Sequence, residues 1–169
     1  MAETAPRRRK APVTKTITVP GNFRQAVHEF NTHRFFECHE SLEEVWQQEQ
    51  GEVRDLYKGL IQVAAAWVHV RRNNEFGVRR LLTTALGYLA PYRPEGAMGF
   101  NVEEICVAAE AALAEAARLG KDHVEELYPE FVPVYRLDET AIPAEARRWA
   151  AWGFDSDGNE LEMEITVIE

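Results

Sequence analysis

The sequence predicts a mainly α-helical protein: a bundle of about five helices with a small β-sheet or strap formed by the chain termini. Apolar residues recur at helical spacing through most of residues 22–120. Polar and apolar residues instead alternate near each end, at 13–19 and 161–167, as in half-buried strands. A length of 169 residues with 46% hydrophobic content is enough for one domain with its own core.

The chain is expected to have three parts. Residues 1–12 form a disordered basic tail around Arg7–Lys10. Residues 13–120 form the helical-bundle core domain. Residues 121–169 form a C-terminal extension with a short helix and a strand, packed on the core.

Five helices account for most of the core domain, and they are expected at about residues 22–32, 35–49, 52–72, 75–89 and 102–120. Asn22 and Asn101, each followed three residues later by Gln or Glu, predict capped helix starts, and Gly120 predicts an end. The third helix is expected to be central. It has a broad apolar stripe, and small residues such as Ala65 and Ala66 on its other face allow close approach.

The two terminal strands each need a partner for their backbone groups. They are expected to pair with each other, with the extended segment 131–137 as a candidate third strand. The resulting sheet would strap both termini against the bundle and cover one end of the region around His39. A short helix is expected over about 143–152, opened by a proline.

Composition narrows the functional class. The longest apolar run, "GLIQVAAAWVHV", is too short to span a membrane, which takes about 20 residues. Two cysteines make no disulfide framework, and a cytoplasmic protein is the default expectation. A net charge of −9 argues against nucleic acid as a partner.

The stretch "FFECHESLEEVW", residues 35–46, contains a histidine and a carboxylate one helical turn apart, His39 and Glu43. The helical wheel places His39, Leu42 and Trp46 on one stripe, with Glu43 at its margin. This predicts a buried His–Glu site, and such a pair can supply two ligands to Zn²⁺ or Mn²⁺.

The local string H-E-x-x-E resembles the zincin H-E-x-x-H, in which the residue after the first histidine is the general base. Glu40 would take that catalytic role here. A catalytic zinc needs a third protein ligand. His69 is the best candidate, with Gln62, Glu37 and His33 as others.

A purely structural interpretation remains open beside the metal site. A buried carboxylate needs a partner, and Gln62 from the next helix could complete a His39–Glu43–Gln62 network in the core. In either interpretation, Glu37, Trp46 and Gln62 position a ligand or belong to the network.

The H-x-x-x-E-x-x-W pattern of His39, Glu43 and Trp46, followed by "GLIQ" at 59–62, resembles the domain of unknown function 309 family of bacteria and archaea. The resemblance covers about residues 22–92. It implies an all-helical fold and the family's label of predicted metal-dependent hydrolase.

Three functional hypotheses follow. The first is a metal-dependent hydrolase of unknown substrate. The alternative is a non-enzymatic structural or protein-interaction module. A nucleic-acid accessory protein ranks last, resting on Arg7–Lys10 and the arginines of 71–80. The partner is an unknown small molecule or protein, no membrane is expected, and a homodimer is left open.

Overall fold

The fold is mainly helical, as the sequence predicts. The computed structural model describes residues 10–18, 21–143, 153, 155, 157 and 159–167. Its five α-helices are α1 Gly21–Asn31, α2 Phe35–Gln48, α3 Arg54–Arg71, α4 Glu75–Leu89 and α5 Val102–Leu119. Each begins and ends within two residues of its predicted bounds, because the apolar periodicity that defines a helix is local.

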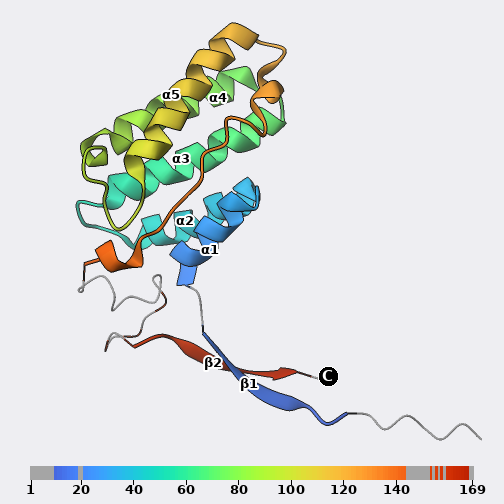
Figure 1. Ribbon diagram of the computed structural model, residues 1–169, viewed down its shortest axis with the longest axis vertical. Coiled ribbons are helices and arrows are strands. Elements are labelled where there is room, and N and C mark those ends of the chain that lie inside the picture. The colour runs from blue at the N-terminus through green and yellow to red at the C-terminus, as the bar shows by residue number, and fades with distance from the viewer. Residues whose placement is uncertain are drawn as a thin grey trace, which may run out of the picture.

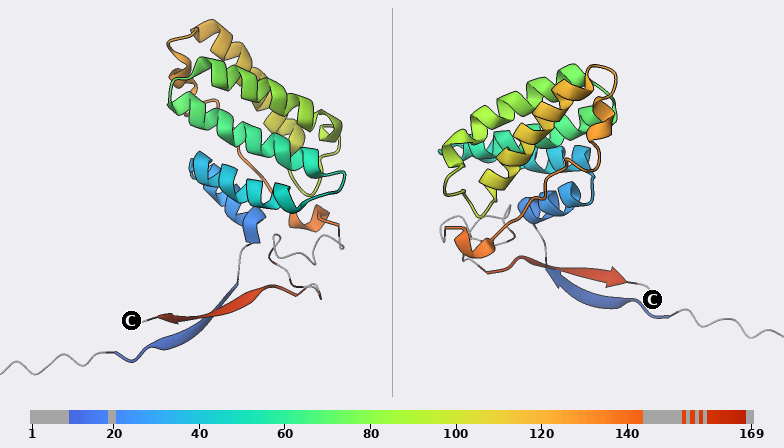
Figure 2. Two further views of the ribbon diagram at one scale, coloured as in Figure 1. Left: turned by 180° about the vertical axis from the view of Figure 1, so that it is seen from behind. Right: turned by 45° about the horizontal axis from the view of Figure 1, so that its top comes forward.

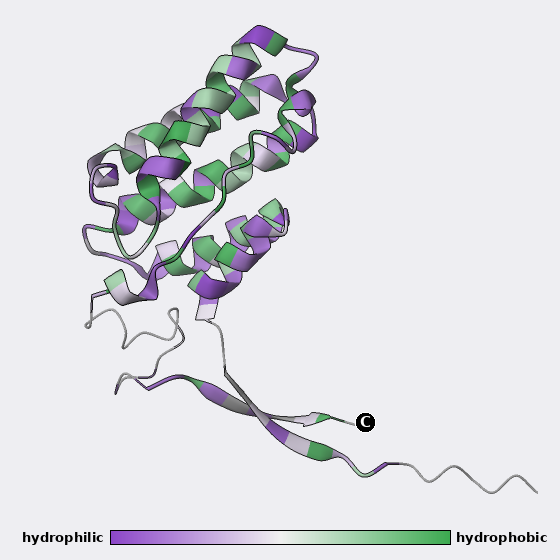
Figure 3. Cartoon of the chain, in the orientation of Figure 1, coloured by the Kyte–Doolittle hydropathy of each residue, from purple (hydrophilic) through white to green (hydrophobic). Residues whose placement is uncertain are grey.

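Helices that follow one another in the chain lie side by side, and α3 is at the centre of the array (Figures 1 and 2). Buried residues cover most of the circumference of α3, from Leu56 to Val70. One stripe of α3 is only half buried, and it consists of Lys58, Gln62, Ala65 and His69. Every helix carries both hydrophobic and hydrophilic positions, as helices on the surface of a core do (Figure 3).

The two helical hairpins, α1–α2 and α3–α4, turn in the same way. The middle residue of each turn has a positive φ, 63° at His33 and 54° at Asn73. The N–H of the next residue donates to a carbonyl five residues back, at 2.7 Å in the first turn and 2.9 Å in the second. A left-handed residue after a helix allows this bond, which satisfies the last carbonyls and reverses the chain.

The side chains of the two asparagines predicted to cap helices bond to other parts of the chain instead. Helix α1 already begins at Gly21, so Asn22 lies inside it and donates to Glu44 of α2 at 2.7 Å. Asn101 precedes α5 but makes no side-chain capping bond. Its amide instead donates to the Val134 carbonyl at 2.9 Å. Asn101 is thus the N-cap residue of α5, as predicted, but without a side-chain bond to the helix, whereas the predicted cap at Asn22 was wrong.

A strap, residues 128–137, begins with a turn and continues as extended chain from residue 132; it runs from beyond the end of α5 back towards α1 (Figures 1 and 2). The Asn31 amide donates to the Tyr135 carbonyl and accepts from the Tyr135 N–H, both at 2.8 Å. The Asn101 amide bonds the residues on either side of Tyr135: it donates to the Val134 carbonyl and accepts from the Arg136 N–H. Two asparagine side chains thus replace neighbouring strands, and Tyr135 is left 1% exposed in the core.

The terminal strands β1 Val13–Thr18 and β2 Glu162–Val167 pair antiparallel, with Val13 opposite Val167. The predicted terminal sheet is therefore confirmed, but the described residues give it two strands and 131–137 is not one of them. The sheet projects from the bundle in all three views (Figures 1 and 2), and residues 13–16 are exposed. The expectation that this sheet straps the bundle and covers the His39 region was wrong; residues 128–137 are the strap. The helix expected over 143–152 falls almost entirely outside the described residues.

Among the described residues, no helix has both the length and the apolar character that crossing a membrane requires.

Candidate functional site

Helix α2 presents a buried face flanked by two half-buried ones. The buried positions are Phe35, Cys38, Leu42 and Val45. His39 and Trp46 lie on the flank towards α3, not on the buried stripe where the wheel placed them. Cys38, at 0% exposure, takes the central position instead, because the packing of α1 and α3 fixes the rotation of α2.

His39 and Glu43 do meet, but at the surface. The His39 Nε2 lies 3.4 Å from a Glu43 carboxylate oxygen, as expected for residues one turn apart. The two side chains are 29% and 41% exposed. The expected buried His–Glu site is therefore a half-exposed pair, and solvent screening makes its contribution to stability small.

Trp46 lies at the end of the same flank. The Arg54 guanidinium carbon is 3.9 Å from the centre of a Trp46 ring, and the Lys58 ammonium is 4.3 Å from it. Cations at this distance are attracted to the negative face of an indole. Helices α2 and α3 are antiparallel neighbours. Residues earlier in α2, such as His39, therefore lie beside residues later in α3, such as Gln62.

Three residues where this flank of α2 meets α3 each leave a buried polar atom without a hydrogen-bond partner in the described chain. These atoms are His39 Nδ1, Trp46 Nε1 and Gln62 Oε1. The His39–Glu43–Gln62 network expected from the sequence therefore lacks its link to Gln62. An unsatisfied buried polar atom costs about 1–3 kcal/mol.

The residues of the predicted metal site do not converge. The described part of the chain contains no group of three or more His, Cys, Asp or Glu side chains placed to hold a metal ion. His69 packs at the start of α4, where its Nδ1 is 2.9 Å from the Asn74 amide. Burial, with a smaller effect of Arg72, lowers the pKa of His69. His33 is paired with the Tyr128 hydroxyl at 2.6 Å. Neither histidine joins His39 and Glu43 in a trio.

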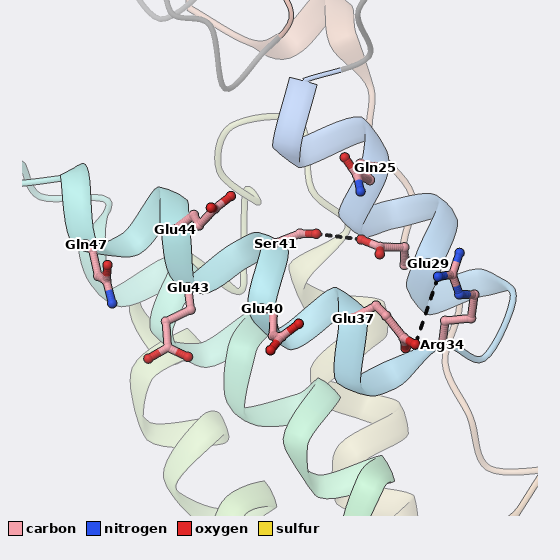
Figure 4. A pocket seen from close by; sticks show the side chains of 9 residues that line it. All are labelled: Gln25, Glu29, Arg34, Glu37, Glu40, Ser41, Glu43, Glu44 and Gln47. Carbon is pink, nitrogen blue, oxygen red and sulfur yellow. Dashed lines mark hydrogen bonds and ion pairs between the residues drawn. The ribbon is translucent and has the colours of Figure 1, made fainter.

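A hollow with a volume of about 620 Å³ lies between α1 and α2 (Figure 4). Its lining residues are Gln25, Glu29, Arg34, Glu37, Glu40, Ser41, Glu43, Glu44 and Gln47. Glu40, the predicted general base, is exposed on its wall, as is Glu44. We call this hollow the acidic groove.

Glu29 is the residue of the acidic groove that sequence reasoning missed. It is only 4% exposed, and its carboxylate accepts a hydrogen bond from Ser41 Oγ at 2.6 Å. Figure 4 shows Glu29 reaching from α1 across to α2. Its place three residues after Ala26, beside the apolar stripe of α1, was the available signal.

The bundle and its motif flank define a small helical domain, and part of this domain is similar to a known family. Residues 23–81 match the family described as Domain of unknown function (DUF309), which confirms the resemblance drawn from the motif. The Uncharacterized protein YpuF of Bacillus subtilis (strain 168) is 43% identical over 59 residues, 34% of this chain and 34% of YpuF. The chain therefore spans about a third of the length of that relative. No solved structure matches.

Proposed function

We propose that this protein is a protein-interaction module that binds a basic segment of a partner protein along the acidic groove. The observation that carries the proposal is the arrangement of its carboxylates. Five glutamates and one arginine line the groove, and no three described carboxylates converge on a point. In Figure 4 Glu37, Glu40, Glu43 and Glu44 are spread along α2, and Glu29 faces this helix from α1. An extended row of negative charge suits a chain of Lys and Arg side chains better than a single metal ion.

Electrostatics favour a transient, salt-sensitive contact. Exposed ion pairs contribute about 0.2–1 kcal/mol each and weaken as salt is added. Affinity would come from several such pairs together. Glu29 adds a positioned acceptor, because burial and the hydrogen bond from Ser41 hold its carboxyl group in place.

The polar groups of the groove also suit a peptide. Gln25 and Gln47 line it beside the carboxylates. A side-chain amide can donate to a backbone carbonyl and accept from a backbone N–H, so the groove offers partners to an extended main chain as well as to its basic side chains. A hydrolase has no comparable support among the described residues.

The test uses a fluorescein-labelled octa-arginine peptide and measures its Kd by fluorescence polarisation. The double variant Glu40→Gln/Glu44→Gln keeps side-chain size and the acceptor for Asn22 while removing two charges from the groove. We expect it to weaken binding about fivefold, since each exposed pair contributes at most about 1 kcal/mol.

The matched control is Glu126→Gln/Glu130→Gln, which removes two charges from exposed positions outside the groove. We expect this control to change the Kd less than twofold. Equal weakening by both double variants would mean that the peptide senses only the net charge of the protein, and the groove would not be its site.

A further inference from the structure

A second hollow, of about 320 Å³, lies where the α1–α2 turn meets the C-terminal end of α3. It is lined by His33, Arg34, Phe35, Phe36, Glu37, Val68, Arg71 and Arg72. We propose that this corner pocket binds an organic phosphate: a phosphate monoester attached to a flat, apolar body. The proposal is independent of the basic partner segment.

The charge of the corner pocket is opposite to that of the chain as a whole. Three arginines and one glutamate line it, in a protein with a net charge of −9. The one carboxylate, Glu37, is 3.9 Å from Arg34, and both side chains are about half exposed, so this contact is loose. Positive charge therefore remains for a ligand.

Two of these arginines have no acidic partner among the described residues. Most arginines of the described chain form ion pairs: Arg24, Arg34, Arg79, Arg93, Arg118 and Arg136. Arg71 and Arg72 pair with no carboxylate in the described ranges. Two guanidinium groups that line one hollow without a carboxylate partner match the two negative charges of a phosphate monoester, which a carboxylate ligand would match only in part.

Arg71 is held in position by the strap. Its guanidinium carbon lies 4.6 Å from the centre of the Tyr128 ring. The Tyr128 hydroxyl is bonded to His33 Nδ1 at 2.6 Å, and its ring meets Phe35 edge-on. A guanidinium stacked on a ring keeps its N–H edge free to bind phosphate oxygens. The pocket therefore has at least one donor oriented before any ligand arrives.

The apolar part of the pocket defines the rest of the ligand. Phe36 is 52% exposed and Val68 lies on the same lining. An exposed aromatic ring beside an anion site offers a stacking surface to a planar group. The volume of the hollow is at the low end for small-molecule sites, so a compact ligand fits better than a polymer.

The experiment titrates phenyl phosphate into ¹⁵N-labelled full-length protein and follows amide shifts by NMR. We expect shifts centred on residues 33–37 and 68–72. Arg71→Gln and Arg72→Gln should each weaken binding about tenfold, because each removes a charge-assisted bond to the phosphate. Arg80→Gln is the matched control, since Arg80 is also exposed and unpaired in the described chain but lies outside the pocket. It should leave the Kd unchanged.

Two further comparisons separate the parts of the ligand. Phe36→Ala should weaken phenyl phosphate but not inorganic phosphate, and benzoate should bind more weakly than phenyl phosphate. The proposal is overturned by a lack of saturation at 10 mM phenyl phosphate, by equal weakening in Arg80→Gln, or by tighter binding of a single-stranded RNA than of phenyl phosphate at the same residues.

Discussion

Replacing Tyr135 tests whether the strap is part of the cooperative fold. Its hydroxyl donates to the Leu60 carbonyl of α3 at 2.8 Å. Its ring lies parallel to that of Phe30, with centres 3.7 Å apart and planes 6° from parallel. With 1% of its surface exposed, the side chain connects the strap to both α1 and α3. Tyr135→Phe removes only the hydroxyl, and Tyr135→Ala removes the ring as well.

The two substitutions should differ several-fold in cost. A net intramolecular hydrogen bond contributes about 0.5–1.5 kcal/mol. The Leu60 carbonyl lies inside α3, where the helix ladder already supplies a donor, so Tyr135→Phe should cost about 1 kcal/mol. Loss of a buried aromatic ring typically costs about 3–5 kcal/mol, which is the expectation for Tyr135→Ala.

Urea unfolding at 25 °C, followed by tryptophan fluorescence, measures both values. Tyr88→Phe is the matched control, because no described group bonds to its hydroxyl, and it should change the free energy of unfolding by less than about 0.5 kcal/mol. A cost below 1 kcal/mol for Tyr135→Ala would refute the reasoning, since the strap would then be detached from the core in solution.

Three other predictions concern packing, polar satisfaction and pH. Gly59→Ala would place a Cβ 2.5 Å from the Leu89 Cγ, so the free energy of unfolding should fall by about 1–3 kcal/mol, whereas Gly87→Ala meets nothing within 4 Å and should raise it by about 0.5–1 kcal/mol. Gln62→Leu removes an unsatisfied buried oxygen and should raise the free energy of unfolding by about 1 kcal/mol; a lower midpoint in urea would show that the amide is bonded in solution. Burial raises the pKa of Tyr135 well above its usual value, so the folded protein keeps this proton while the unfolded chain loses it near pH 10. The free energy of unfolding should therefore fall as pH rises above about 10. In Tyr135→Phe that fall should be shallower by about 1.4 kcal/mol per pH unit. Urea midpoints measured from pH 8 to 11 test this, and the same pH dependence in the parent protein and the variant would contradict it.

The pairing of the terminal strands shows what local pattern can and cannot predict. Alternation alone identified both strands, and because each needed a partner, a small terminal sheet was expected. That the two strands pair antiparallel is known only from the structure. The position of the sheet did not follow. Whether the strands lie against the bundle depends on the path of the segments that connect them to the helices. The alternation of polar and apolar residues does not predict that path. The segment 131–137 was predicted to be extended. Its backbone partners are not strands but the side-chain amides of Asn31 and Asn101, and no local sequence pattern predicts such partners.

The sequence by itself determined the helical class, the helix bounds and the i, i+4 meeting of His39 with Glu43, because each depends on residues close together in the chain. Only the tertiary structure decided that this pair is half exposed and that Glu29 reaches into the acidic groove. It also decided that His69 packs against the start of α4 and not beside the pair. The physical reason is that periodicity defines which residues share a helical face. The rotation of that face, and what it meets, is set by packing against helices distant in sequence.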